Sequence, residues 1–162
     1  MNISLTVNGE KILLQSPADS SLLSVLRKQK LLQVKRGCEK GTCGSCIVLM
    51  NKVPVPACKI PVAFAMDSEI VTLEYFSRSE VYFDMYSDIM KGFSRAGIKL
   101  CGFCNSGKIF AAKAILDSSV KPTRAMVYEQ IKTLSPCCTD CDTLTNGILY
   151  AFEFHVKRKG LS

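Results

Sequence analysis

Residues 37–46 of this 162-residue chain read GCEKGTCGSC and carry three of its nine cysteines. Four residues separate Cys38 from Cys43, two separate Cys43 from Cys46, and Cys58 follows after an interval that suits a short β-hairpin. This spacing is typical of a plant-type [2Fe-2S] site, in which cysteine thiolates hold the cluster. The stretch therefore predicts an N-terminal domain built around an iron–sulfur loop, with these four cysteines as the metal ligands.

Small residues fill the positions between these cysteines. Gly37, Gly41, Gly44 and Ser45 lack bulky side chains, so they let backbone N–H groups approach the sulfurs of a cluster. We therefore assign the three glycines to cofactor binding. Zinc usually uses two Cys-x-x-Cys pairs, and the N-terminal half holds only one. Thiols that merely fill a core would lie on an apolar stripe, not in a glycine-rich loop.

The sequence around this loop predicts a mixed sheet. Asn8-Gly9 favours a tight β-hairpin, and a helix with an apolar stripe is expected over residues 22–28, capped by Asp19 or Ser20. Alternating or β-branched residues predict the strands. These expected strands are residues 3–7, 11–14, 47–50, 53–55 and 69–74.

The second half of the chain has helical periodicity. Thr123 and Thr143 are the expected starts of the last two helices. The expected helices are residues 81–96, 106–116, 123–134 and 144–156. The change of pattern predicts an α+β protein with a mixed-sheet domain over residues 1–77 and a helical domain over residues 78–162.

A second group of cysteines lies in this helical half. The motif Cys101-Gly102-Phe103-Cys104 falls between two expected helices, and a later interhelix loop holds Cys137, Cys138 and Cys141. A lone Cys-x-x-Cys is a weak signal, because zinc knuckles and redox dithiols share it. The two loops can, however, meet at one end of a helical bundle and enclose a second cluster. We therefore assign Gly102 to cofactor binding, with Cys101 and Cys104 as ligands.

Composition and charge bear on the expected partners and on the expected cellular compartment. The net charge of +7 would suit nucleic acid, but the basic residues are scattered and there is no tryptophan for base stacking, so no nucleic-acid partner is expected. The first residues lack the features of a signal peptide, and no apolar run approaches the roughly 18 residues that span a bilayer. We expect a cytoplasmic protein whose reduced thiols hold metal. His155, the one histidine, is expected at the surface with no chemical role.

These motifs recur together, in matching order, in one known family. The matching segments are residues 37–46, Cys58, residues 71–74, residues 101–104, Gly107 and residues 121–123. In them the chain resembles the small iron–sulfur subunit of the molybdenum hydroxylases, the group of xanthine dehydrogenase, aldehyde oxidoreductase and carbon monoxide dehydrogenase. The resemblance implies a β-grasp ferredoxin-like domain followed by a four-helix bundle, each with one [2Fe-2S] cluster.

The resemblance also implies a role and partners. The chain would be the non-catalytic electron-transfer subunit of an oxidoreductase, relaying electrons from a molybdopterin-binding large subunit to an FAD-binding subunit. Leu100 stands where the family usually has a glutamine that contacts the pterin, and Asn105-Ser106 replace a Thr-Pro pair. These departures leave two alternatives open, a stand-alone ferredoxin-like carrier and a zinc-stabilised interaction module.

The last two ligands of the second cluster also depart from the family pattern. The family's Cys-x-Cys pair falls on Pro136 and Cys138, so a fourth thiolate must come from Cys137 or Cys141. Side chains of adjacent residues in an extended loop point apart, which disfavours Cys137 beside Cys138. A two-residue gap is a common chelating arrangement. We therefore expect Cys138 and Cys141 as ligands, with Cys137 as the alternative fourth ligand.

Overall fold

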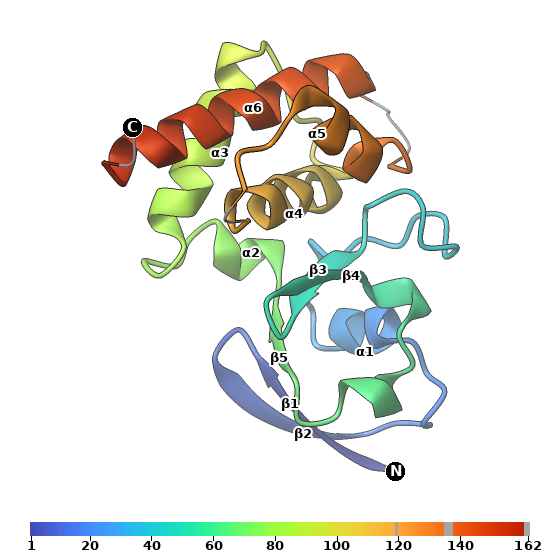
Figure 1. Ribbon diagram of the computed structural model, residues 1–162. Helices are drawn as coiled ribbons and strands as arrows, with labels where there is room; N and C mark the ends of the chain where they lie inside the picture. Colours follow the sequence, from blue (N-terminus) through green and yellow to red (C-terminus); the bar gives the residue numbers. More distant parts are fainter. Residues whose placement is uncertain (119, 135–137, 161–162) are drawn as a thin grey trace.

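The first half of the chain folds into one mixed sheet. Its strands are β1 (Asn2–Val7), β2 (Glu10–Gln15), β3 (Ile47–Met50), β4 (Val53–Pro56) and β5 (Glu69–Val71). They lie in the order β2-β1-β5-β3-β4, with β1 and β5 parallel and the other neighbouring pairs antiparallel. The computed structural model describes residues 1–118, 120–134 and 138–160 (Figure 1).

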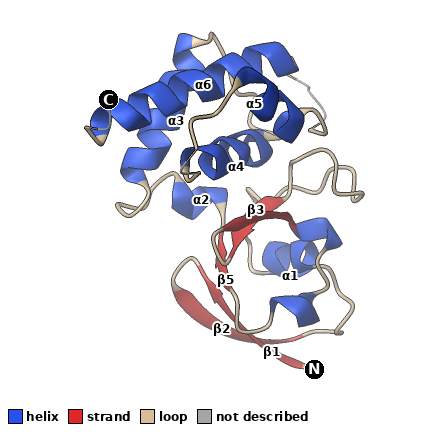
Figure 2. Cartoon of the chain, in the orientation of Figure 1, coloured by secondary structure: helices blue, strands red, loops and turns tan. Residues whose placement is uncertain are grey.

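Helices make up most of the second half. The α-helices are α1 (Leu22–Lys28), α2 (Leu73–Phe76), α3 (Phe83–Arg95), α4 (Asn105–Leu116), α5 (Arg124–Ile131) and α6 (Cys141–Arg158). Two short 3-10 helices, η1 (Ala57–Lys59) and η2 (Val62–Ala65), lie between β4 and β5. Figure 2 shows α3 to α6 gathered on one side of the sheet, with α1 beside the strands. The predicted α+β class, a ferredoxin-like domain followed by a helical domain, is confirmed.

The buried apolar residues form two clusters, and Leu49 of β3 and Val71 of β5 belong to the helical one. In the first cluster, the leucines of α1 are buried together with Ile3 and Leu5 of β1. The apolar stripe of α1 is therefore covered by the neighbouring hairpin. In the second, the long helices pack around Phe93 and Phe110. Phe76 of α2 belongs to this helical core although it precedes the expected boundary at residue 77, and that boundary stays a prediction.

Several expected element ends were wrong, and the helix expected over residues 123–134 ends at Ile131. Ser21 caps α1, since its Oγ accepts a hydrogen bond from the backbone N–H of Ser24 at 3.2 Å. The last strand ends at Val71, because the N–H of Thr72 is donated to Asn8 Oδ1 at 2.9 Å and α2 begins at the next residue. This hydrogen bond to Asn8 thus ends β5 before the expected end of the strand.

Another wrong end is the start of α6, which lies at Cys141 and not near residue 144. Asp140 is the N-cap, and its Oδ1 accepts the backbone N–H of Thr143 at 2.8 Å. Hydrogen bonds from Thr143 lower the pKa of the Asp140 carboxyl. An ionised aspartate at a helix N-terminus is at least as good a cap as threonine, so α6 gains its first turn.

His155 is buried, which makes the expectation of a surface histidine wrong. The side chains of His155 and Asp88 are 5% and 2% exposed, and His155 Nδ1 lies 3.0 Å from Asp88 Oδ2. Arg158 Nε donates to the same carboxylate oxygen at 2.9 Å. A buried carboxylate requires partners of this kind, and α6 supplies both from one face.

Helices α3 and α6 approach each other most closely at Gly92. A methyl group there would lie 2.3 Å from the backbone nitrogen of Ala151 and 2.5 Å from the carbonyl oxygen of Gly147. We expect Gly92→Ala to lower the free energy of unfolding by about 1–3 kcal/mol, because backbone atoms cannot move aside as a flexible side chain can. Denaturant unfolding measures this loss.

The exposed residue Ser94 in the same helix provides the matched control. Ser94→Ala should change the free energy of unfolding by no more than about 0.5 kcal/mol. Equal stability of Gly92→Ala and the wild type would contradict the close helix contact.

Candidate metal centres

The first cysteine loop connects α1 to β3. Cys46 is buried at the end of this loop, directly before β3, and Cys58 lies in η1 after the β3–β4 hairpin. The backbone N–H of Ala57 donates to the carbonyl oxygen of Cys46 at 3.2 Å, which holds the start of η1 against the end of the loop. The hairpin thus returns Cys58 to the vicinity of Cys46, and the joint binding of metal by Cys38, Cys43, Cys46 and Cys58 stays a prediction.

Backbone amides in the loop point at sulfur. Cys38 Sγ accepts hydrogen bonds from the N–H groups of Lys40 at 3.3 Å and Cys43 at 3.4 Å, and from the Thr42 hydroxyl at 3.5 Å. These bonds, with that of Thr42 the largest cause, lower the pKa of Cys38 to about 5. The side chain is therefore a thiolate at neutral pH, which is the form that binds metal.

Cys46 has the opposite environment. Burial, together with the nearby thiols of Cys58 and Cys43, raises the pKa of Cys46 to about 12. A buried thiol of this kind gives up its proton when a metal takes its place. The loop thus combines a half-buried thiol whose pKa is lowered with a buried thiol whose pKa is raised.

The glycines of this loop occupy positions where a side chain would not fit or would be strained. A methyl group on Gly37 would lie 2.7 Å from Cys43 Sγ, and Gly41 and Gly44 have positive φ angles of 84° and 75°. In the second loop Gly102 has a φ of 92°, but open space surrounds it. These geometries explain the need for glycine, and direct contact of the four glycines with a cofactor stays a prediction.

The second cysteine group forms at one end of the helical domain. The sulfur atoms of Cys101, Cys104 and Cys138 all lie within 4.8 Å of one another. Cys104 is the N-cap residue of α4 and is buried, whereas Cys101 is exposed. Three of the predicted ligands are therefore brought together from two loops that are distant in sequence.

The fourth position of this site is not part of that group. Cys141 is the first residue of α6, is half-buried, and lies outside the three-sulfur set. Cys137 and Pro136 lie outside the described residues. Cys141 as a ligand, with Cys137 as its alternative, stays a prediction.

The two cysteine loops touch each other. Ser106, two residues after Cys104, donates its hydroxyl to the carbonyl oxygens of Gly44 at 3.0 Å and Ser45 at 3.2 Å. Gly107 packs on the same segment so closely that a methyl group on it would lie 2.8 Å from Gly44 Cα. The start of α4 therefore rests directly on the loop between Cys43 and Cys46, at the junction visible in Figure 1.

Sequence reasoning missed one residue at this site. Lys108 lies one turn after Cys104 in α4, is only 3% exposed, and its Nζ donates to Cys104 Sγ at 2.6 Å. The available signal was the four-residue spacing, which places both side chains on one helix face. A lysine directly before the apolar run of residues 109–112 was a second hint.

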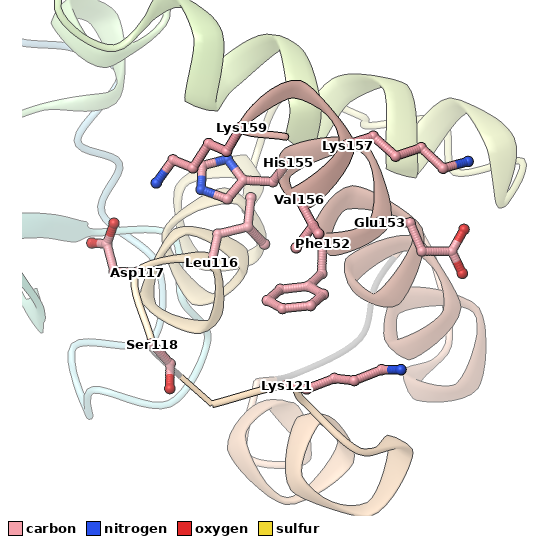
Figure 3. Close-up of a pocket in the computed structure, with 10 residues that line it drawn as sticks. All are labelled: Leu116, Asp117, Ser118, Lys121, Phe152, Glu153, His155, Val156, Lys157 and Lys159. Carbon is pink, nitrogen blue, oxygen red and sulfur yellow. The ribbon is translucent and has the colours of Figure 1, made fainter. Parts of the chain in front are cut away.

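A cavity of about 780 Å³ lies elsewhere, at the C-terminal ends of α4 and α6 (Figure 3). Its wall comprises Leu116, Asp117, Ser118, Lys121, Phe152, Glu153, His155, Val156, Lys157 and Lys159. Cys104 and Cys141 lie at the opposite, N-terminal ends of these two helices. The 12 residues of α4 span roughly 18 Å. The cavity is therefore separate from the second cysteine group.

Comparison with known proteins agrees with this two-site organisation. Residues 5–70 match the family described as the 2Fe-2S iron–sulfur cluster binding domain, and residues 72–149 match the [2Fe-2S] binding domain. The small FeS subunit of nicotinate dehydrogenase from Eubacterium barkeri is 32% identical over 154 residues, which cover 94% of this chain and 96% of that relative. The iron–sulfur-binding subunit of xanthine dehydrogenase from Escherichia coli O157:H7 is 35% identical over 116 residues, 72% and 70% of the two chains.

Solved structures give the same result. A chain of quinoline 2-oxidoreductase from Pseudomonas putida 86 superposes with a TM-score of 0.81 at 30% identity, covering all of this chain and 98% of that one. The aldehyde oxidoreductase of Desulfovibrio desulfuricans has a TM-score of 0.80 at 31% identity, with 99% of this chain covering 17% of that longer chain. None of the described helices is long and apolar enough to cross a membrane.

Two [2Fe-2S]-binding domains in one chain, with their cysteine loops in contact, define an electron-transfer iron–sulfur protein. The chain belongs to the family of small iron–sulfur subunits of the molybdenum hydroxylases. The resemblance noted in the sequence is thereby confirmed, and so is the electron-transfer role within an oxidoreductase.

Proposed function

We propose that this chain carries electrons, one at a time, from a molybdopterin centre in a large partner subunit to FAD in another partner subunit. In this proposal the cluster of the helical domain lies nearer the pterin and that of the ferredoxin-like domain nearer the flavin. The chain itself makes and breaks no bond of the substrate. We further expect the complex in the cytoplasm, where thiols stay reduced.

The contact between the two cysteine loops is the observation that supports this relay best. Ser106, two residues after Cys104, donates to the carbonyl oxygens of Gly44 and Ser45, and Ser45 directly precedes Cys46. The segments around both metal sites are thus packed against each other within one chain. Such an arrangement suits electron transfer between two centres, and a single-site carrier has no need of it.

The donor atoms fit iron–sulfur chemistry. Both sites offer cysteine sulfur, and soft thiolate ligands select iron–sulfur clusters or zinc over metals that prefer oxygen. When bound, a [2Fe-2S] cluster takes up and releases a single electron. The N–H groups of Lys40 and Cys43 that point at Cys38 Sγ would favour negative charge on sulfur there.

The rim of the second site supports an approach by a partner subunit. Cys101 and Gly102 are exposed, and the Phe103 side chain between the ligands is 50% exposed. An exposed aromatic beside a redox site is a suitable contact for another protein surface. Leu100 packs on the helical core and brings no hydrogen-bonding group to this rim, so the pterin contact of the family's glutamine has no counterpart in that side chain.

Anaerobic purification of the native complex through a tag on this chain tests the proposal. We expect about four irons and about four acid-labile sulfides per chain, with molybdenum and flavin co-purifying. Electron paramagnetic resonance of the dithionite-reduced complex should give two distinct signals. Iron is expected in both domains because both offer thiolate sites.

Two other outcomes would replace the proposal. A chain that contains iron and cycles reversibly, but never purifies with molybdenum or flavin, would be a stand-alone carrier. Colourless protein with zinc and without iron would be a zinc-stabilised interaction module, since iron–sulfur protein is reddish-brown.

A further inference from the structure

A buried lysine is hydrogen-bonded to a ligand of the second site. Lys108 Nζ donates to Cys104 Sγ at 2.6 Å, and the two residues are 3% and 4% exposed. The four-residue spacing along α4 places the side chains one turn apart, so the helix itself holds the ammonium over the sulfur. This geometry leaves little room for water to screen the contact.

The burial of an ammonium group requires a nearby negative charge. Desolvation of an isolated ammonium is far too unfavourable for a stable fold, and buried lysines are paired with anions. A metal-bound cysteine is a thiolate, and a hydrogen bond from a cation to an anion is among the strongest in proteins. Lys108 is therefore placed to respond to the charge of whatever Cys104 binds.

We propose that Lys108 raises the reduction potential of the cluster in the helical domain, an inference that rests on the proposed function. Uptake of one electron converts a pair of ferric ions into one ferric and one ferrous ion and makes the cluster one unit more negative. The attraction between the Lys108 ammonium and the site grows with the added negative charge. The electron comes from the molybdenum centre of the complex, or from dithionite in the experiment.

The same helix contains a matched control. Lys113 is 4% exposed, but its Nζ pairs with the Asp117 carboxylate and lies 3.5 Å from the carbonyl oxygen of Lys52. Its described partners are oxygen atoms. Substitution of Lys113 therefore removes a buried positive charge from α4 and leaves the hydrogen bond to Cys104 in place.

The experiment is a redox titration of the purified complex, followed by electron paramagnetic resonance. Lys108→Met keeps an unbranched side chain and removes the charge and the donor. At the wild-type midpoint potential we expect its reduced-to-oxidised ratio for the second cluster to fall about tenfold, which is a downward shift of about 59 mV for a one-electron couple. The first cluster should titrate as in the wild type, and Lys113→Met should shift neither.

Two further variants keep the test decisive if Lys108→Met fails to assemble. Lys108→Gln retains an N–H donor without charge and should give a smaller downward shift, while Lys108→Arg retains the charge and should titrate close to the wild type. An unchanged midpoint in Lys108→Met or Lys108→Gln, or an equal shift in Lys113→Met, would overturn the proposal. So would loss of the second cluster in all three Lys108 variants, because the lysine would then serve assembly.

The iron content of the wild type distinguishes a failure of the Lys108 proposal from a failure of the proposed electron relay. If the wild-type chain holds about two irons, the second cluster is absent, and the proposed relay fails together with the role of Lys108. If the wild type holds about four and only the predicted shift is missing, the relay stands and the role of Lys108 alone is wrong.

Discussion

Cys104→Ser protein purified without air should contain about two irons per chain where the wild type contains about four. Cys104 is buried at the start of α4 and shares the three-sulfur group with Cys101 and Cys138. A serine hydroxyl is a poor replacement for a thiolate toward iron. Iron and sulfide assays, with electron paramagnetic resonance of the reduced protein, measure the loss.

The variant Cys58→Ser provides the reciprocal control. It should remove the signal of the ferredoxin-like domain and leave that of the helical domain, because Cys58 lies in η1 beside Cys46 and is a predicted ligand of the other site. If both substitutions removed the same signal, the assignment of one cluster to each domain would be wrong.

Single serine substitutions then identify the fourth ligand of the second site. Cys138→Ser should lose the second signal like Cys104→Ser, since its sulfur lies in the same group. We propose Cys141 as the fourth ligand, because it lies in the first turn of α6 and is separated by two residues from Cys138, a common chelating arrangement. Loss of the second signal in Cys137→Ser and its retention in Cys141→Ser would assign Cys137 instead.

Features set by neighbours along the chain could be predicted from the sequence. Asn8-Gly9 makes a tight turn because both residues accept a positive φ, here 53° and 85°. The spacing of the cysteines in residues 37–46 indicated a metal loop. A metal site needs several sulfur ligands and a backbone that can wrap around the metal. Neither inference depends on how distant parts of the protein pack.

Features set by contacts between distant segments could not be predicted in this way. Nothing near His155 in sequence reveals that Asp88 of α3 will be buried against it, and a histidine near a helix end is usually exposed. For Lys108 the four-residue spacing to Cys104 was a local hint, but its burial follows only from the packing that covers this face of α4. In both cases a polar group is buried because a partner, 67 or four residues away, offsets its desolvation.

The contact between the two metal loops belongs to this second kind, and it makes Gly107→Ala the other substitution with a large expected effect. The added methyl group would lie 2.8 Å from both the Cα and the carbonyl oxygen of Gly44. Alanine favours a helix over glycine by about 1 kcal/mol, but overpacking against backbone disfavours the fold by about 1–3 kcal/mol. The loop and α4 must therefore move apart.

This separation should weaken the communication between the two clusters. Magnetic coupling between two reduced centres falls steeply with distance, so the line broadening that each signal causes in the other should decrease in Gly107→Ala. The rate at which electrons pass from the second cluster to the first, followed by rapid freezing, should decrease as well. Removal of the Ser106 hydroxyl in Ser106→Ala should act in the same direction with a smaller effect, because it removes one hydrogen bond to Gly44 and adds no bulk.

The control for Gly107→Ala is a substitution that enlarges a side chain on the exposed face of the same helix. Ala114→Met adds more atoms to α4 than Gly107→Ala does, yet residue 114 faces solvent, so both signals and the electron-transfer rate should stay as in the wild type. Retention of wild-type coupling in Gly107→Ala would mean that electron transfer between the two clusters does not depend on the contact at Gly44. Since this contact is what best supports the relay, that result would require another route between the clusters.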